Sequence, residues 1–504
     1  MPTPFLLSAV ALMLACSDKA GPSPGDDSAG TTGATDTATG DTTDTGGTTD
    51  TAADTADEPT TDDTGGSTSG PDDTAPTWDE VQVSDVTWTL NPDIAAIIHV
   101  SWQQDAAADA WVEFRLDGED WRASPRERRE VGAQEVLLLG VPYDSDVTFR
   151  VVNDFGDGPL TTDELTAHTD LLPEDTPVPV LNVADADRWD PDSAWLLIGL
   201  SGGGSGWNAD IFWRLIVDRQ GRIVWAQETP NDYRTFYMQP SYDGSAILWE
   251  ENTFWTDFDE GLGTIAHRMT IDGTITETFD LSGMHHAFLE LAGGVMLWSG
   301  FDGEHEVIRE RPPGGEEREI WDGTEFWETQ GEAQDCDINA LYWNEADDTI
   351  YLSSDNGNAV MEIDRSSGAV IHVWGQLRDA WAFAEGSNPF WNQHSPTRTA
   401  EGNLLVSTWV GQRDQEMVAR EYVIDEENEV LREVWSCGEG SGIEAGAAGE
   451  AHRLAGGNTL LNYGTGGHLR EYTSDCEVVW HAEWTNGNLL GRAIFLEDLY
   501  AFAP

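Results

Sequence analysis

The chain has 504 residues, enough for several domains, and its 93 Asp and Glu residues against 25 Lys and Arg give a formal net charge of −68. Such an acidic surface repels nucleic acid and anionic lipid headgroups, so we exclude both as partners of the folded part. Only four cysteines are present, and their spacing is not that of a zinc site.

Residues 1–16 read MPTPFLLSAVALMLAC, an apolar run that ends in a small residue and a cysteine. This pattern predicts a lipoprotein-type signal peptide in which Cys16 becomes the lipidated first residue. The run is shorter than the roughly 20 residues that a helix needs to span a bilayer. No Lys or Arg precedes it, which leaves plain secretion or an accidental apolar start open. The segment resembles the bacterial lipoproteins, in which a residue such as Ser17 rather than Asp after the cysteine implies the outer membrane or cell surface. The periplasm or the medium are the alternatives, and any membrane contact would be through the lipid anchor.

Residues 17–76 consist almost entirely of Thr, Asp, Gly, Ala, Ser and Pro, without an aromatic residue. Such a segment buries too little apolar surface to offset the entropy lost on ordering. We predict a disordered, charged tether between the anchor and the folded domains.

Short alternating segments follow within residues 77–170, and they predict a small β-sandwich. The strands are expected at 99–104, 111–118, 135–141 and 147–154, with weaker ones at each end. Their order resembles a fibronectin type III module. A Pro-rich, acidic stretch at 171–190 is expected to be a linker.

Residues 191–504 repeat a two-part unit six times, which predicts a six-bladed β-propeller and an all-β fold. One part is a turn and a strand that ends in an aromatic residue, as in 217–225, 270–279, 311–321, 363–374, 423–435 and 473–480. The other part is a turn and an apolar strand, as in 192–200, 243–249, 292–298, 347–353, 401–407 and 456–462. The repeated tryptophans are expected to pack between the blades.

The segment before each apolar strand should form the innermost strand of its blade, and several of these segments carry histidine. HHAFLEL holds His285 and His286, QHSPTRT holds His394, and EAHRL holds His452. His286 and His394 both lie eight residues before a turn glycine, Gly294 and Gly402. Equal positions in two repeats should face the same space, so we expect these two imidazoles to lie together.

The stretches HHAFLEL, DINALYWNEADDTIYLSSDNGNAVMEIDRSSGAVIHVWG, NQHSPTRTAEGNLLVSTW and HRLAGGNTLLNYG resemble the bacterial aryl sulfate sulfotransferases, over roughly 175–500. The resemblance implies transfer of a sulfuryl group between phenols through a sulfated histidine, without a cofactor. By position, His394 would be the nucleophile and His286 a sulfate ligand. The other residues expected to bind the substrate are His285, Asn339, Arg398, His452 and Arg453.

The chain departs from the family pattern at two positions that should hold cationic or neutral donors. Asp337 stands in place of the first histidine of His-x-Asn, and Asp355 in place of the arginine of Ser-Ser-Arg. Three interpretations therefore stay open. The propeller is a sulfotransferase with a rearranged anion site, or an inactive binding or scaffold protein at the cell surface. In the third, His286, His394, Asp337 and Asp355 hold a divalent metal.

The remaining cysteines bear on stability. In an oxidising compartment Cys437 and Cys476 are expected to form a disulfide, which leaves Cys336 unpaired. The sequence leaves homodimer formation and the identity of the donor and acceptor phenols open.

Overall fold

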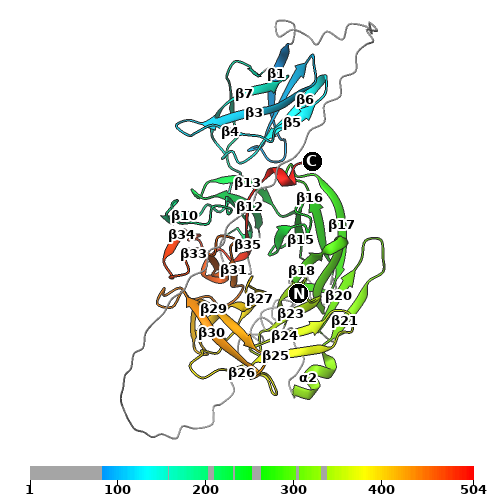
Figure 1. The fold of residues 1–504 in the computed structure, drawn as a ribbon, viewed down its shortest axis with the longest axis vertical. Coiled ribbons are helices and arrows are strands. Elements are labelled where there is room, and N and C mark those ends of the chain that lie inside the picture. Colours follow the sequence, from blue (N-terminus) through cyan, green and yellow to red (C-terminus); the bar gives the residue numbers. More distant parts are fainter. Residues whose placement is uncertain are drawn as a thin grey trace, which may run out of the picture. The chain divides into compact units, whose positions relative to one another are not determined.

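A computed structural model describes residues 82–156, 158–202, 209, 211–230, 233–252, 263–301, 306–330 and 338–504 (Figure 1). The predicted signal peptide with Cys16, the predicted tether at 17–76, Cys336 and Asp337 lie outside these residues. Residues 82–504 form one compact unit, and the linker boundary at 171–190 stays a prediction. Within the described part of the chain, no helix has the length and apolar character to cross a membrane.

The first part of this unit consists of two sheets that share one core. Strands β1 (Val83–Leu90), β2 (Ile98–Gln104) and β6 (Gly132–Leu138) form one sheet. The other contains β4 (Arg122–Ala123), β3 (Ala108–Leu116), β7 (Asp146–Asp154) and β8 (Pro159–Thr161), with β5 (Glu127–Arg129) on β3 and β9 (Leu165–His168) on β7. Every second residue of β3 is buried, as expected for a strand with one face on a core. Val100 and Trp102 of one sheet pack with Val112 and Phe114 of the other.

The rest of the described chain forms six antiparallel sheets that follow the sequence repeats, and the protein is a β-propeller. The first two contain β35 (Leu490–Leu496), β11 (Trp195–Ser201), β12 (Phe212–Asp218) and β13 (Ile223–Glu228), and then β14 (Met238–Pro240), β15 (Ile247–Glu251), β16 (Gly263–Met269) and β17 (Ile275–Ser282). The third and fourth contain β18 (Met284–Leu291), β19 (Val295–Phe301), β20 (Glu306–Arg311) and β21 (Arg318–Asp322), and then β22 (Ile338–Asn344), β23 (Thr349–Ser354), β24 (Ala359–Asp364) and β25 (Val370–Gly375).

The last two sheets each gain a strand at the outer edge. The fifth contains β27 (His394–Arg398), β28 (Leu404–Gly411), β29 (Asp414–Asp425) and β30 (Val430–Cys437), with β26 (Ala382–Phe383) parallel to β30. The sixth contains β31 (Glu450–Arg453), β32 (Thr459–Asn462), β33 (His468–Tyr472) and β34 (Val478–Glu483), with β10 (Val180–Ala184) on β34. The described helices are α2 (Thr324–Gln330) and the single 3-10 turns η3 (Ala292–Gly294), η4 (Gly464–Gly466) and η5 (Tyr500–Phe502).

The two ends of the repeat region close the ring. The C-terminal strand β35, red in Figure 1, pairs with β11 and so becomes the innermost strand of the first sheet. At the other end, β10 pairs with the last strand of the sixth sheet. Neighbouring inner strands are also tied together. Arg492 of β35 donates to Gln239 of β14 at 2.8 Å, and Gln239 donates to the Phe288 carbonyl of β18 at 2.8 Å.

The ring continues through the remaining inner strands. β18 packs against β22, and Asn339 of β22 donates to the carbonyl of Gln393, just before β27, at 2.9 Å. Glu450 of β31 accepts from Ser395 of β27 at 3.4 Å and from the backbone N–H of Ala493 in β35 at 2.9 Å. Polar contacts and packing therefore link all six inner strands in a closed circle.

Tryptophans at repeated positions pack between neighbouring sheets, as the sequence predicts. Five of them are less than 2 % exposed or at that limit, namely Trp225, Trp249, Trp298, Trp374 and Trp480. Three of the indole N–H groups donate to backbone carbonyls, from Trp225 to Ile271 at 2.7 Å, from Trp298 to Ser282 at 3.1 Å and from Trp480 to Arg219 at 2.9 Å. Cys437 at the end of β30 forms a disulfide with Cys476, in the turn before β34, with Cα atoms 5.4 Å apart. This bond joins the fifth and sixth sheets.

Candidate functional site

The inner strands bring five ionisable side chains together, and with one tyrosine they form what we call the inner-strand cluster. Its members are Tyr237, His286, His394, Glu450, His452 and Arg492. They come from β18, β27, β31 and β35 and from the residue before β14. The Glu450 carboxylate lies 3.5 Å from His452 Nε2 and 3.9 Å from Arg492 Nε, and the Arg492 guanidinium lies 5.9 Å from the Tyr237 ring. His394 interacts electrostatically with Glu450 and Arg492, and His286 interacts with His394, so that their pKa values shift.

Irregular strand pairing marks the inner strands at these residues. The register of β18 shifts between Met284 and Phe288, which brackets the two histidines. The register of β27 shifts between His394 and Thr397, and that of β35 shifts opposite Ile198 to Leu200, next to Arg492. β-Bulges re-aim side chains and are common beside functional sites. Three of the six cluster residues, His286, His394 and Arg492, therefore lie at irregularities of the strand pairing.

Strain accompanies the bulge in β27. Ser395, the residue after His394, has a φ of +52°, a region that residues with a Cβ rarely adopt. The position is held from both sides, because Ser407 Oγ donates to the carbonyl of His394 at 3.0 Å and Gln393 donates to three groups of the fourth sheet. Strain held in this way is frequent at functional positions.

His394 is a buried, neutral imidazole. Its pKa falls to about 4, mainly because of burial; the Glu450 carboxylate and the backbone of Gly449 oppose this decrease, and Arg492 adds a smaller one. The side chain interacts with Gly449 through a hydrogen bond, and among the described residues no group hydrogen-bonds its Nδ1. A neutral imidazole with a lone pair that no described group occupies is a potential nucleophile.

His285 and His286 form a second imidazole unit. Their Nδ1 atoms are 2.5 Å apart, and the rings meet edge to face at 4.7 Å between centroids. His285 Nε2 lies 3.2 Å from the Glu306 carboxylate, and both side chains are fully buried. If Glu306 accepts the Nε2 proton of a neutral His285, the shared Nδ1 proton belongs to His286, which puts the lone pair of His286 on Nε2. Burial, His285 and His394 hold the pKa of His286 well below its usual value.

Glu450 supplies a negative charge to the cluster. Burial alone would raise its pKa, but His452, Arg492 and the N–H of Ala493 outweigh burial and lower the pKa to about 2. His452 Nε2 lies 3.5 Å and Arg492 Nε 3.9 Å from the carboxylate. Asn462 also donates to it at 3.3 Å. The carboxylate is therefore ionised and largely compensated at neutral pH.

Arg492 supplies the fixed positive charge. Its backbone N–H donates to the carbonyl of Phe236 at 2.6 Å, and its Nη1 donates to Gln239 at 2.8 Å. The distance to Glu450 is too long for a bidentate ion pair. The guanidinium thus keeps donors that could hold an anion.

Two arginines expected to bind the substrate make their described contacts elsewhere. Arg398 donates to the carbonyl of Gly402 and to the hydroxyl of Tyr351. Arg453 pairs with Glu421 and stacks over Trp435 at 4.5 Å. Both guanidinium groups therefore support the strands around them. The structure does not bring them to the inner-strand cluster.

The polar residues of the fourth sheet lie next to β27. Asn339 holds the carbonyl of Gln393, and its side-chain oxygen is buried without a hydrogen bond from the described residues. Burial raises the pKa of Asp355 to about 6, against a hydrogen bond from Asn392. Asp337 lies outside the described residues. Among the described residues, Asp355 does not converge with His286 and His394 as metal ligands would.

Sequence reasoning missed three members of the cluster, Tyr237, Glu450 and Arg492, and one neighbouring residue, Glu306. Glu450 could have been found, because it stands two residues before His452 and alternate residues of a strand share a face. Arg492 lies in a strand that falls outside the repeat alignment. Glu306 faces His285 only through the pairing of β19 with β20.

No protein-family model matches the chain, and none of the curated proteins does. Among solved structures it is similar to a protein of unknown function from Bacteroides caccae, with 18% identity over 57% of this chain and 93% of that one and a TM-score of 0.39. Virginiamycin B lyase from Staphylococcus aureus shows 13% identity over 63% of this chain and 100% of its own, with a TM-score of 0.34. A quinoprotein alcohol dehydrogenase-like protein from Bacteroides thetaiotaomicron shows 9% identity over 80% and 94%, also with a TM-score of 0.34. Similarity at this level carries no information about chemistry.

Proposed function

We propose that the inner-strand cluster transfers a sulfuryl group from an aryl sulfate to a phenol, with His394 as the nucleophile. The observation that carries the proposal is the neutral His394 imidazole, whose Nδ1 meets no hydrogen-bonding group of the described residues, beside the guanidinium of Arg492. The resemblance of the four histidine- and asparagine-bearing stretches to the aryl sulfate sulfotransferases supports the same reaction. The exported, lipid-anchored location remains part of this proposal.

The reaction divides into two transfers. The His394 nitrogen attacks the sulfur of the donor, the bond between sulfur and the phenolic oxygen breaks, and a phenolate leaves as a sulfohistidine forms. The acceptor phenol then attacks the same sulfur, its proton passes to a base, and the nitrogen–sulfur bond breaks. Covalent catalysis of this kind replaces one difficult step with two easier ones.

Charge decides whether the cluster can hold an aryl sulfate. A carboxylate at about 4 Å from the sulfate would cost roughly 4 kcal/mol at an effective dielectric constant near 20. Glu450 is engaged by donors from β31, β32 and β35, so little of its charge is uncompensated. Arg492 is the cation that takes the place we expected for Arg398 or Arg453. Groups fixed before the reaction stabilise developing charge without reorganisation.

The direct test is sulfuryl transfer from a chromogenic aryl sulfate to phenol by the full chain. We expect His394→Ala to lose at least about 1,000-fold in kcat, because removal of a nucleophile abolishes the covalent route. His372→Ala is the matched control, since His372 pairs with Glu362 on outer strands of the fourth sheet and should leave the rate unchanged.

Absence of transfer by the folded protein with all tested aryl sulfates would contradict the sulfotransferase proposal. Transfer that survives in His394→Ala would contradict the role of this residue. In the first case the inner-strand cluster is better interpreted as the binding site of a surface or scaffold protein. The ionised Glu450 within the cluster is the observation that favours this second function.

A further inference from the structure

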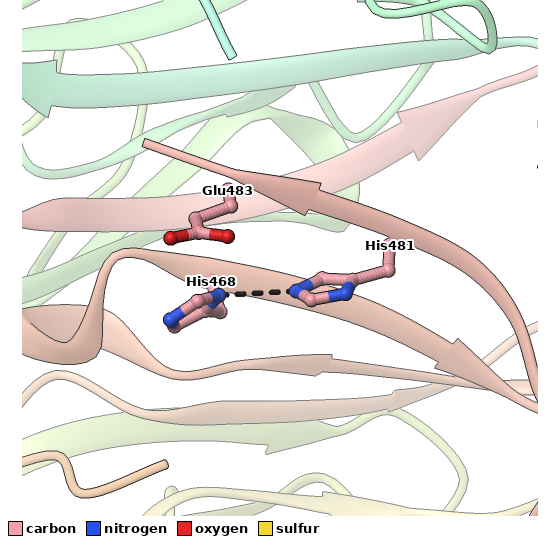
Figure 2. Close-up of side chains that lie close together, drawn as sticks. All are labelled: His468, His481 and Glu483. Carbon is pink, nitrogen blue, oxygen red and sulfur yellow. Dashed lines mark hydrogen bonds between the residues drawn. The ribbon is translucent and has the colours of Figure 1, made fainter. Parts of the chain in front are cut away.

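Two histidines and a glutamate meet on β33 and β34 of the sixth sheet, two and three positions along the strand order from β31 of the inner-strand cluster. His468 in β33 is directly opposite Glu483 in β34, and Arg470 is directly opposite His481. Residues two apart in a strand point to the same face. His468, His481 and Glu483 therefore share one face of this strand pair, and Figure 2 shows their side chains turned toward one another.

The distances suit a metal ion. His468 Nδ1 and His481 Nε2 are 3.0 Å apart, and one ligand atom of each of the three side chains lies within 4.8 Å of the other two. Two zinc–nitrogen bonds of about 2.0–2.1 Å at a tetrahedral angle place the nitrogens about 3.4 Å apart. The imidazoles need to separate by only a few tenths of an ångström.

Neighbouring residues support this arrangement from outside. Asn182 of β10 donates to Glu483 Oε2 at 2.8 Å, and hydrogen bonds to ligating carboxylates are usual around protein-bound metals. The ring of Tyr463 lies 6.3 Å from that of His468. Arg470 is the one arginine or lysine of β33 and β34, and its positive charge would disfavour a cation nearby. Its side chain contacts Tyr472 and the ring of Tyr463.

We propose that His468, His481 and Glu483 form a zinc site, with His468 Nδ1, His481 Nε2 and one oxygen of Glu483 as ligands. Imidazole nitrogens suit zinc and other late first-row ions better than calcium or magnesium, which prefer oxygen ligands. His481 is buried whereas His468 and Glu483 are partly exposed. A fourth, water-filled position on the exposed side completes a tetrahedral ion.

The expected consequence is a more stable ring. The three ligands join β33 to β34, and Asn182 extends the connection to β10, the strand from the start of the propeller. A ligand that binds only the folded state raises the free energy of unfolding. Zinc should therefore act on the closure of the sixth sheet and leave the inner-strand cluster untouched.

The test is zinc binding by the full chain after removal of metals with a chelator. We expect one equivalent of Zn²⁺ to bind by calorimetry and to raise Tm, and we expect Mg²⁺ at the same concentration to do neither. His481→Ala and Glu483→Gln should each weaken binding at least 10-fold. Because His481 is buried, a folded far-UV spectrum of each variant is required before its affinity is interpreted.

The matched control is His372→Ala. His372 lies 2.8 Å from Glu362 on the third and fourth strands of the fourth sheet, the same strand positions, but no second histidine of the described residues joins them. This variant should bind Zn²⁺ as the unchanged chain does. Loss of binding in His394→Ala with retention in His481→Ala would overturn the proposal, because it would place the ion in the inner-strand cluster. Absence of a zinc equivalent in the unchanged protein would overturn it as well.

Discussion

The inner-strand cluster holds two titratable groups whose environments both lower their pKa values. His394 is neutral because its pKa falls to about 4, whereas Glu450 stays ionised because its pKa falls to about 2. Strongly shifted pKa values of neighbouring groups are frequent at functional sites. At neutral pH, His394 therefore has a lone pair and Glu450 has a compensated negative charge.

This environment predicts an unusual pH dependence. An imidazole nucleophile acts in its neutral form, which is present above its pKa. We expect kcat/KM for sulfuryl transfer to stay constant as the pH falls through the ordinary histidine value of 6.5 and to decline only as it passes about 4. The measurement is a rate profile from pH 8 to the acid limit of stability.

A second variant sharpens this prediction. Arg492 lowers the pKa of His394, so Arg492→Gln should move the acid inflection upward. An inflection near 6.5 in the unchanged protein would mean that the nucleophile is not buried as described. An inflection that Arg492→Gln leaves unchanged would show that Arg492 has no electrostatic effect on His394.

The histidines could be predicted from the sequence and the charged partners could not. His286 and His394 have equal offsets from the turn glycines Gly294 and Gly402, whose φ values are +78° and +82°. Those turns fix where the strands begin and end. Residues with equal offsets from them therefore occupy equivalent positions in the third and fifth sheets. No turn glycine of the repeat sets the position of Arg492. Its strand β35 lies near the end of the chain but pairs with β11 in the first sheet.

At the scale of the strands, the inner-strand cluster is associated with β-bulges. Regular strands would direct successive side chains to opposite faces, but β18, β27 and β35 each shift register at a cluster residue. The sequence contains no signal for these shifts beyond Pro396, which follows Ser395. Strand existence was therefore predictable from apolar patterns, whereas side-chain direction at the inner ends was not.

The disulfide between the fifth and sixth sheets gives a prediction at the same scale. Cys476→Ala should lower the free energy of unfolding by about 2–4 kcal/mol, because the bond closes a loop with a sequence separation of 39 residues. Cys476 is exposed, so the substitution removes the cross-link without opening a cavity. The measurement is denaturant unfolding in the presence and absence of a reducing agent.

Two outcomes are informative in that experiment. Reduction should weaken the unchanged chain to the level of the variant and should leave the variant as it was. Equal stability of the variant and the oxidised chain would show that the connection between the two sheets does not depend on the covalent bond.

At the scale of the whole molecule, residues from the two ends of the propeller complete the ring. β35 supplies the inner strand of the first sheet, and β10 supplies the outer strand of the sixth. Six repeats in the sequence predict the number of sheets, but the choice of which terminal strand completes which sheet depends on pairing over nearly 300 residues. Local patterns carry no information about such distant partners.

Gly491 tests this closure. The residue lies in β35 against the backbone of Phe236, so an added Cβ would collide with that backbone. We expect Gly491→Ala to lower the free energy of unfolding by about 1–3 kcal/mol, the usual cost of overpacking. Denaturant unfolding measures the change.

Gly411→Ala is the control for that substitution. Gly411 also ends a strand, but the nearest atom to an added Cβ is the Asp414 Cβ at 3.9 Å. The stability of this variant should remain within about 0.5 kcal/mol of the unchanged chain. Equal effects of the two substitutions would contradict a tight junction between β35 and the second sheet.

The most direct measurement of the central claim is the site of covalent labelling by an aryl sulfate donor in the absence of acceptor. We predict that the full chain gains one sulfuryl group, that peptide mapping places the group on His394, and that added phenol removes it. A sulfuryl group on another residue, or turnover without any labelled intermediate, would contradict the assignment of His394 as the nucleophile.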